Sequence, residues 1–394
     1  SKMINKKISR LISKLKKDFR SIHHTQLSKN FLKDNFRFNY NKNEISDSGL
    51  DRIFSFAEYI YKDNKKKLSG FNKNDIWTEF TKKKDHNNLE KICLEKDKSK
   101  FKQTLDELGK SDLIYGLSNF SNYQNLLASE KEKDKEASQL IDKLISLSEY
   151  TKHLKVYNPE HGGGGWIIDN LDFQDLIKKI FVAEDKEIVP FKSPNYTFGY
   201  QIEDKFYSIK DFLNFYTSIR MNEIIKNNKS LEIISEIGAG LGHAAYYSKM
   251  LNNKHYNIYD LPNILILQAY YLMLSLSENE VHLANEKKNN FAKVSLYPYW
   301  EIFNLPILDN TLWLNQDSLP QIDINIAKEY INKLKLGKNS FFLSINQESK
   351  NANTNGKYQF PVHEIIKLSN SNFKKIYRSR DFLRLGFIEE LYYW

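Results

Sequence analysis

The sequence predicts an α/β protein: a Rossmann-like, doubly wound and mostly parallel seven-stranded sheet, preceded by an all-helical N-terminal domain. Two observations predict this fold. After about residue 205, strand-like and helix-like stretches alternate over roughly 190 residues, the order that builds a parallel sheet covered by helices. The first 150 residues instead place apolar side chains at helical spacing, as at Ile53, Phe56, Ala57 and Ile60.

Length and composition limit the number of domains, the size of the core and the kinds of site that the chain can form. A chain of 394 residues is long enough for two domains, or for one large domain with an extension. With 41% apolar residues it can bury a sizeable core. The single cysteine, Cys93, excludes a disulfide framework, a cysteine zinc site and an iron–sulfur cluster. No apolar run is long enough to span a membrane and no apolar signal core is seen, so we expect a soluble cytoplasmic protein.

The excess of basic over acidic residues is unevenly distributed along the chain. Residues 1–150 hold 31 Lys+Arg and 22 Asp+Glu, whereas residues 151–394 hold 28 and 27. Within the first part, residues 8–19 have the spacing of a basic amphipathic helix. Such a helix either makes a peripheral contact with an anionic membrane surface or polymer, or packs on the protein with its lysines in water. We therefore expect a basic helical domain over residues 1–150.

A connecting segment is expected over residues 151–204, where glycine and proline gather. Gly162–Gly165 lie between His161 and Trp166, and Pro190 and Pro194 follow. This composition suits a lid over a sugar, and it equally suits a flexible connection between domains. The second domain is then expected over residues 205–394.

The alternating pattern of this second domain is justified element by element. Helices are predicted at 208–225, 242–252, 262–277, 323–335 and 361–369. Strands are predicted at 231–237, 255–259, 281–284, 310–316, 340–346, 373–379 and 384–391. The last two strands are joined by a short turn, which favours an antiparallel edge on the parallel sheet.

The strongest motif is the strand ending at Ile237, its glycine turn Gly238-Ala239-Gly240-Leu241-Gly242 and the following helix. Backbone N–H groups at such a turn can meet a polar ligand. A dinucleotide fingerprint would need glycine at position 243, which is His243, and Glu236 would repel a pyrophosphate while favouring a cationic ligand. The next strand ends at Asp260, whose carboxylate can accept both ribose hydroxyls or cap the helix that begins at Pro262.

The pattern E-x-G-x-G-x-G resembles the first motif of class I S-adenosyl-L-methionine (SAM) methyltransferases, in which the glycine turn passes under the amino-acid end of the cofactor. Asp260-Leu261-Pro262, the segment 313–320 and the segment 341–348 are similar to bacterial sugar O-methyltransferases associated with capsule polysaccharide and lipopolysaccharide biosynthesis. The resemblance covers about residues 195–394, roughly half of the chain. It implies that SAM is the cofactor and that these residues bind it: Glu236, Gly238, Ala239, Gly240, Gly242, Asp260, Leu261, Asn315 and Gln316.

Transfer of a methyl group to a sugar hydroxyl is helped by a base that takes the hydroxyl proton. The candidate catalytic residues are Asp317, Glu348 and His363. Asp317 is expected to be this base or a ligand of a divalent ion, and the alternative is that it caps the next turn. Glu348 either holds sugar hydroxyls or is a solvated acid, and His363 is either a base or an ordinary residue of a helix start. No pair of acids or histidines has metal-ligand spacing, so the sequence does not support a metal site.

The expected activity is O-methylation of a sugar hydroxyl in a bacterial surface glycan or its nucleotide-linked precursor, an anionic acceptor that a basic domain would attract. Specific nucleic-acid substrates are disfavoured. The segment Asn315–Ser318 lacks the prolines and the aromatic residue used for methylating base amino groups, and Cys93 lies far from the glycine turn. The alternatives are a SAM-dependent methyltransferase acting on RNA, protein or a small metabolite, and a non-catalytic scaffold of the same fold.

Overall fold

The computed structural model describes residues 35–67, 82–117, 123–156, 171–348 and 359–394 of the chain. The basic helix predicted at residues 8–19 and the glycine cluster Gly162–Gly165 lie outside these ranges. Their expected roles therefore stay predictions.

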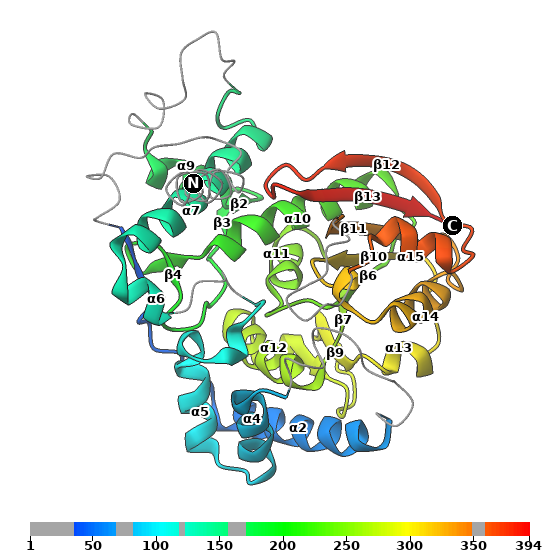
Figure 1. Ribbon diagram of the computed structural model, residues 1–394, viewed down its shortest axis with the longest axis horizontal. Helices are drawn as coiled ribbons and strands as arrows, with labels where there is room; N and C mark the ends of the chain where they lie inside the picture. Colours follow the sequence, from blue (N-terminus) through cyan, green and yellow to red (C-terminus); the bar gives the residue numbers. More distant parts are fainter. Residues whose placement is uncertain (1–34, 68–81, 118–122, 157–170, 349–358) are drawn as a thin grey trace, which may run out of the picture.

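An eight-stranded sheet forms the centre of the second half of the chain (Figure 1). Its order across the sheet is β12-β13-β11-β10-β6-β7-β9-β8. All neighbouring strands run parallel except β13, which is antiparallel to both β11 and β12. The strands are β6 Ile233–Ile237, β7 His255–Asp260, β8 Val281–Leu283, β9 Val294–Pro298, β10 Thr311–Gln316, β11 Phe341–Gln347, β12 Lys374–Arg380 and β13 Phe387–Tyr393. The predicted doubly wound sheet with an antiparallel edge is confirmed.

The expected number of strands was wrong by one. The seven predicted strands all exist, but β9 was not among them, and it lies between β7 and β8. Its five residues form a short apolar run that ends in Pro298, a residue that favours a turn when only the sequence is considered. Val294 and Leu296 are buried and pair with β7, so tertiary packing overrides that local signal.

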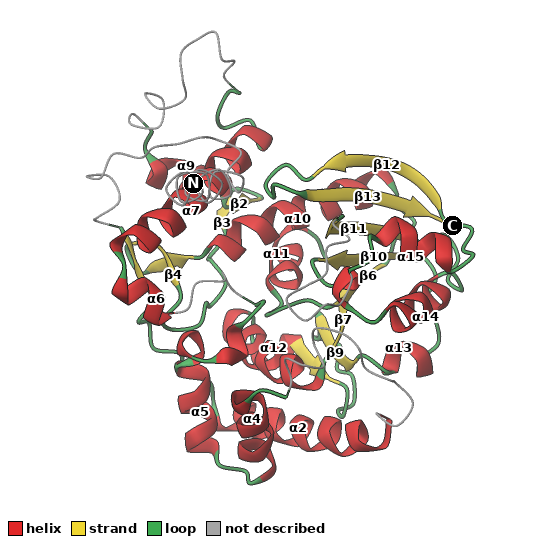
Figure 2. Ribbon diagram, viewed as in Figure 1, coloured by secondary structure: helices red, strands yellow, loops and turns green. Residues whose placement is uncertain are grey.

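Helices cover both faces of the sheet (Figure 2). One face carries α10 Ile209–Asn227, α11 His243–Leu251 and α12 Pro262–Ser275, and the other carries α13 Glu301–Asn304, α14 Ile324–Leu334 and α15 Val362–Leu368. Because successive strand side chains point to opposite faces, Ile258 joins the first core and Tyr259 the second. Trp313 stacks on Tyr259 in the second core, with ring centroids 5.9 Å apart. Between these two layers the carboxyl ends of β6, β7 and β10 meet at one edge.

The first 150 residues are not all helical. Among the described residues they contain α2 Asp47–Lys67, α4 Lys84–Leu94, α5 Lys98–Asp106, α6 Tyr123–Ala128 and α7 Glu130–Tyr150, but also a strand, β1 Phe36–Phe38. This strand pairs antiparallel with β4 Phe198–Ile202, which pairs with β5 Lys205–Tyr207. Three residues give too short a pattern to reveal a partner 160 positions away, so local periodicity could not predict it.

Apolar packing, an ion pair and a hydrogen bond join the N-terminal helices to the sheet layer. Helix α2 packs against α12, and both contribute to one hydrophobic core. Arg52 on α2 forms a bidentate ion pair with Glu286, at 2.7 and 2.8 Å, and Tyr61 donates a hydrogen bond to Asn263 Oδ1 at 2.7 Å.

The segment expected to be a connection, residues 151–204, also contains helices and strands: α9 Phe173–Ile180, β2 Val182–Ala183 and β3 Lys186–Glu187. In the described ranges no helix has the length and apolarity needed to cross a membrane.

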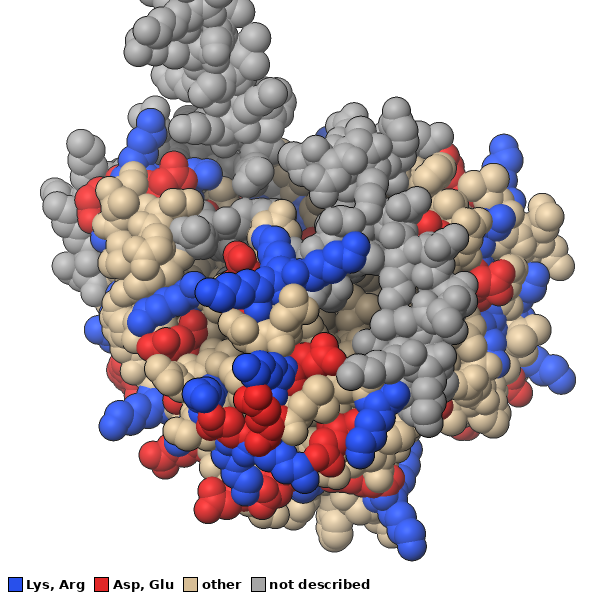
Figure 3. Space-filling model, turned by 60° about the horizontal axis from the view of Figure 1, so that its bottom comes forward, with Lys and Arg blue, Asp and Glu red and all other residues tan. Residues whose placement is uncertain are grey.

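The described surface does not reproduce the basic character of the N-terminal half. Residues 1–34 hold ten Lys+Arg and two Asp+Glu, whereas residues 35–150 hold 21 and 20. On the lower face of the molecule, acidic and basic side chains are intermixed (Figure 3), and pairs such as Lys96 with Glu58, at 2.9 Å, neutralise one another. Almost all of the excess positive charge therefore belongs to residues 1–34.

Candidate functional site

The glycine turn connects β6 to α11 at the carboxyl edge of the sheet. Gly238, Gly240 and Gly242 all have left-handed backbones, with φ of 74°, 59° and 93°. A Cβ on Gly238 would lie 2.5 Å from the Ser318 hydroxyl, and one on Gly242 would lie 2.9 Å from Leu272. A Cβ on Gly240 would meet nothing within 4 Å. Two of these glycines are thus required by packing, whereas Gly240 leaves open space in which a ligand can approach the backbone.

Hydrogen bonds to the Asp260 side chain join this turn to the end of β7. Its Oδ2 accepts hydrogen bonds from the Ala239 N–H at 2.9 Å and from Gln268 Nε2 at 2.6 Å, and its Oδ1 accepts from the Leu261 N–H at 2.7 Å. Gln268 also donates to the Gly240 carbonyl at 2.8 Å. Burial raises the pKa of Asp260 to about 6. A carboxylate has about four acceptor positions, so three internal bonds leave one for a ligand hydroxyl.

Glu236 does not face the ligand space in the way its position predicts. Its side chain is fully buried, accepting hydrogen bonds from the Tyr256 hydroxyl at 2.7 Å and from Gln316 Nε2 at 3.1 Å. Burial raises the pKa of Glu236 to about 8, so the carboxyl is mostly protonated at neutral pH. Glu236 is thus enclosed by its neighbours, and its expected contact with a cationic ligand stays a prediction. Glu236 instead holds β6, β7 and β10 together.

Asn315 and Gln316 at the end of β10 also make their contacts inside the protein. Asn315 donates to the Ile237 carbonyl at 2.8 Å and to the Ser318 hydroxyl at 2.6 Å, and its Oδ1 accepts from the Leu319 N–H at 3.1 Å. Gln316 bridges Glu236 to helix α10 by donating to Asn214 Oδ1 at 2.9 Å. Both residues shape the edge of the site, and Asn315 is fully buried, so the expected contact of these two residues with a cofactor stays a prediction.

Asp317 occupies the position expected of a base at this edge. It follows β10 with a φ of 51°, its N–H donates to the Ile345 carbonyl at 3.1 Å, and its Oδ1 accepts from Gln321 Nε2 at 3.3 Å. Burial raises the pKa of Asp317, and the positive charges of Lys210 and Arg384 partly oppose that effect. The Gln321 contact supports the next turn, so the capping alternative and the base role can coexist.

The other two candidate catalytic residues are brought into contact with each other. His363 Nδ1 lies 3.4 Å from Glu348 Oε1, and Glu348 Oε2 pairs with Arg378 at 2.6 Å. Both Glu348 and His363 are about one-third exposed, with side-chain values of 37% and 36%. Glu348 is thus an ion-paired acid at the end of β11, and Asp317 belongs to a separate set of contacts.

Sequence reasoning missed two cations near this edge, Lys210 and Arg384. Arg384, on the turn between β12 and β13, donates to Gln316 Oε1 at 3.0 Å and pairs with Asp381 at 3.1 Å. Lys210 lies in the first turn of α10 and interacts electrostatically with Asp317 and with His243. A lysine in the first turn runs against the helix dipole, and this is the signal that could have identified it.

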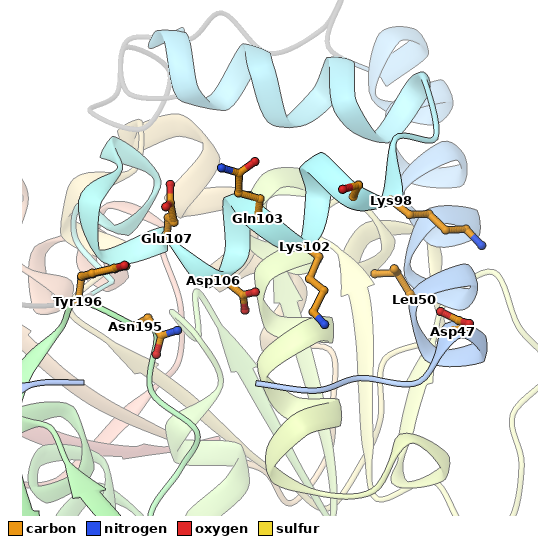
Figure 4. A pocket seen from close by; sticks show the side chains of 10 residues that line it. Asp47, Leu50, Lys98, Lys102, Gln103, Asp106, Glu107, Asn195 and Tyr196 are labelled. Carbon is orange, nitrogen blue, oxygen red and sulfur yellow. The ribbon is translucent and has the colours of Figure 1, made fainter. Parts of the chain in front are cut away.

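A separate pocket of about 550 Å³ opens between α2, α5 and the loop before β4 (Figure 4). Lys102 and Asp106 point from α5 to the same side. The lining mixes acids and lysines, and burial raises the pKa of Asp106. None of the predicted site residues lines this pocket, so it is distinct from the carboxyl edge of the sheet. In the same described ranges no group of three His, Cys, Asp or Glu residues could hold a metal ion.

No protein-family model matches the chain, and no curated protein does. Among solved structures, the chain is similar to the mitomycin 7-O-methyltransferase MmcR, with 9% identity and a TM-score of 0.33 over 47% of this chain and 57% of MmcR. It is also similar to an O-methyltransferase family protein from Burkholderia thailandensis, with 12% identity and a TM-score of 0.32 over 47% of this chain and 59% of that one.

A third similar structure is the magnesium protoporphyrin IX methyltransferase ChlM from Synechocystis PCC 6803 with bound SAH. It shares 9% identity and a TM-score of 0.35 over 47% of this chain and 85% of that one. The chain spans less than two thirds of the length of the first two proteins. Likeness at this level does not assign a family, so the function has to follow from the residues of the site.

Proposed function

We propose that this protein is a SAM-dependent methyltransferase. The observation that carries the proposal is the turn Gly238–Gly242, which Asp260 holds at the carboxyl edge of a doubly wound sheet. Gly240 faces open space there. This is the point where the strand order reverses between β6 and β10, and open α/β sheets bind their ligands at such a point. Gly240, Asp260 and the N-terminus of α11 are the groups that would hold the cofactor.

When bound, SAM supplies a methyl group on a sulfonium that is already a good leaving group. The protein's part is then to position the acceptor and to take its proton as the methyl C–O bond forms and the C–S bond breaks. Asp317 is the residue to which we assign the proton, because it directly follows β10 at the same edge of the sheet as the glycine turn and its raised pKa suits proton acceptance. Glu348, which directly follows β11, and His363, at the start of α15, would contact the acceptor.

The acceptor that we propose is a sugar hydroxyl in a bacterial surface glycan or its nucleotide-linked precursor. Its support is that three segments, 260–262, 313–320 and 341–348, resemble bacterial sugar O-methyltransferases. These segments include the carboxyl ends of β7, β10 and β11, respectively. An anionic acceptor, or an anionic membrane surface that carries it, would be attracted by residues 1–34, which hold eight of the ten net positive charges.

Calorimetric titration with SAM and with S-adenosylhomocysteine tests the cofactor. We expect the wild type to bind both ligands. The affinity of Asp260→Ala should be lower by at least about ten-fold, because the ligand loses its hydroxyl acceptor and the Ala239 N–H loses its partner. Asp323→Ala is the matched control, since Asp323 accepts from the Asn325 N–H at the start of α14, and its affinity should equal that of the wild type. A folded wild-type protein that binds neither ligand would overturn the proposal.

Methyl incorporation from labelled SAM tests the acceptor. Purified protein is offered capsule and lipopolysaccharide fractions, nucleotide sugars, bulk RNA and bulk protein in parallel. Incorporation into a glycan or nucleotide sugar supports the proposed acceptor, whereas incorporation into RNA or protein alone would replace it. Removal of residues 1–34 should weaken acceptor binding and reduce its salt dependence. An unchanged salt dependence would contradict the role given to this segment.

A further inference from the structure

The pocket between α2, α5 and the loop before β4 is lined mainly by polar side chains (Figure 4). One face of α5 supplies four of them, spaced three or four positions apart: Ser99, Lys102, Gln103 and Asp106. Within the described ranges, the side chains of Ser99, Lys102 and Gln103 form no hydrogen bond or ion pair. This face of α5 therefore presents donors and acceptors that the protein itself does not use.

Two further acceptor atoms at the pocket are buried without a donor. Oδ1 of Asp106 and Oδ1 of Asn195 are shielded from solvent, and no described residue gives either a hydrogen bond of normal geometry. The Tyr270 hydroxyl on α12 is near enough to favour the charged form of Asp106, but it too lacks a hydrogen bond of normal geometry. A buried acceptor without a donor is unfavourable. Because the last torsion of Asp and Asn side chains is broad, a small rotation lets a ligand hydroxyl in the pocket supply that donor.

Backbone contacts fix the loop that carries Asn195 and Tyr196. Asn39 Nδ2 donates to the Ser193 carbonyl at 2.8 Å, and the Tyr196 N–H donates to the Asn39 carbonyl at 2.8 Å. The Gly109 N–H donates to the Asn195 carbonyl at 3.2 Å, and a Cβ on Gly109 would lie only 2.3 Å from that oxygen. Tyr196 is held at a φ of 64°, a strained backbone of the kind that recurs at ligand sites. These contacts engage the main chain of the loop and leave the Asn195 side chain for a ligand.

The charges around the pocket disfavour phosphate and metal ligands. Lys98 and Glu107 are each paired with a residue that does not line the pocket. The lining charges that remain are one lysine, Lys102, and two acids, Asp47 and Asp106, so their sum is negative and would repel a phosphate group. Among the described residues no three acids, histidines or cysteines are grouped so that they could hold a metal ion. A neutral ligand with many hydroxyl groups fits this lining better.

We propose that this pocket binds a neutral sugar through its hydroxyl groups. Each sugar hydroxyl both donates and accepts, so it matches a lining that combines carboxylates, amides, a hydroxyl and an ammonium. Leu50 and Tyr196 add apolar surface for the C–H groups of the sugar. The volume of about 550 Å³ is within the range of about 300–1,000 Å³ that is usual for small-molecule sites. This inference goes beyond the proposed function, because the pocket is separate from the carboxyl edge of the sheet and needs no SAM.

Saturation-transfer difference NMR without SAM tests the pocket. The probes are glucose, galactose, mannose, rhamnose and N-acetylglucosamine, with glucose 1-phosphate as the anionic comparison. We expect the wild type to bind at least one neutral sugar with millimolar affinity, and to bind the phosphate no better than glucose. Asp106→Ala should weaken sugar binding by about ten-fold or more, because a charge-assisted hydrogen bond is lost, and Asn195→Ala should weaken it by about three- to ten-fold. Glu95→Ala is the matched control, since it removes an exposed acid at the end of α4 that does not line the pocket.

Every other outcome overturns the inference. A wild-type protein that binds none of the neutral sugars, or binds only the sugar phosphate, has no site of this kind. The pocket is also excluded if Asp106→Ala or Asn195→Ala binds the sugar as tightly as the wild type, or if Glu95→Ala weakens binding equally. If Asp106→Ala does not fold, Asp106→Asn, which keeps the shape and removes the charge, is measured in its place and should weaken binding by at least about three-fold. Because no titration contains SAM, a failure of the proposed cofactor leaves this result unchanged.

Discussion

Gly240→Ala separates ligand binding from folding at the glycine turn. The added Cβ meets no atom within 4 Å, so the substitution introduces no clash in the ligand-free protein. It does place alanine at a φ of 59°, in the left-handed region, at a cost of about 1–2 kcal/mol. The ligand space beside the turn loses one methyl group of volume, and this reduces the approach of a cofactor to the backbone.

The expected result is a small loss of stability and a large loss of affinity. Overpacking a well-fitted contact costs about 1–3 kcal/mol, which corresponds to a SAM affinity that is weaker by roughly 5- to 140-fold. Chemical denaturation measures the first effect and calorimetric titration measures the second. Gly386→Ala is the matched control, because Gly386 also has a left-handed backbone, with a φ of 83°, and open space around its Cα.

The two variants should therefore lose similar stability and differ in affinity. Wild-type affinity for SAM in Gly240→Ala would refute the assignment of this turn to the cofactor. Equal loss of affinity in Gly386→Ala would show that the effect comes from backbone strain and not from contact with the ligand.

Three further predictions concern charge. Glu236→Gln should remove part of the loss of stability that the wild type shows as the pH rises from about 4.5 to 8, because over this range the folded protein, with a Glu236 pKa of about 8, holds a proton that the unfolded chain has released; urea denaturation across pH measures this, and parallel curves for both proteins would contradict it. Asp317→Asn should lower kcat by about 100-fold or more without changing SAM affinity, as measured by methyl transfer and calorimetry; an unchanged kcat would remove Asp317 as the base. Arg220→Met should cost about 3–5 kcal/mol in unfolding free energy, because Glu389, which is 1% exposed and pairs with Arg220 at 2.8 Å, loses its charged partner and keeps only hydrogen bonds from the Tyr216 and Tyr377 hydroxyls. The double variant Arg220→Met/Glu389→Leu should recover most of that loss, and failure to recover it would assign the cost to packing.

The local pattern was sufficient for most elements of the sheet domain. Strands such as β6 and β11 are short apolar runs between turn residues, and helix α12 begins where Asp260 and Pro262 predict a start. These features depend on neighbours within a few positions, so they are readable from the sequence. Strand β9 and strand β1 are not, because each is defined by its pairing with a strand distant in sequence.

The same division holds within the site. The spacing of Gly238, Gly240 and Gly242 predicts a ligand-binding turn, and the position of Asp260 predicts that it lies beside that turn, as the 2.9 Å bond to Ala239 confirms. Sequence position alone predicted a charged Glu236 facing a ligand. Burial raises the pKa of this carboxyl to about 8, although the hydrogen bond from the Tyr256 hydroxyl opposes that shift, and burial is a property of the packed core.

By itself, then, the sequence determined the doubly wound sheet, the glycine turn and the acid that fastens it, because each follows from residues close together in the chain. Only the tertiary structure decided which glycine has free space beside its backbone and which acidic side chains are buried. It also decided that the charge of Lys210 on α10 acts on the imidazole of His243 on α11. The physical reason is that burial, charge pairing and free space depend on elements that meet only after the chain has folded.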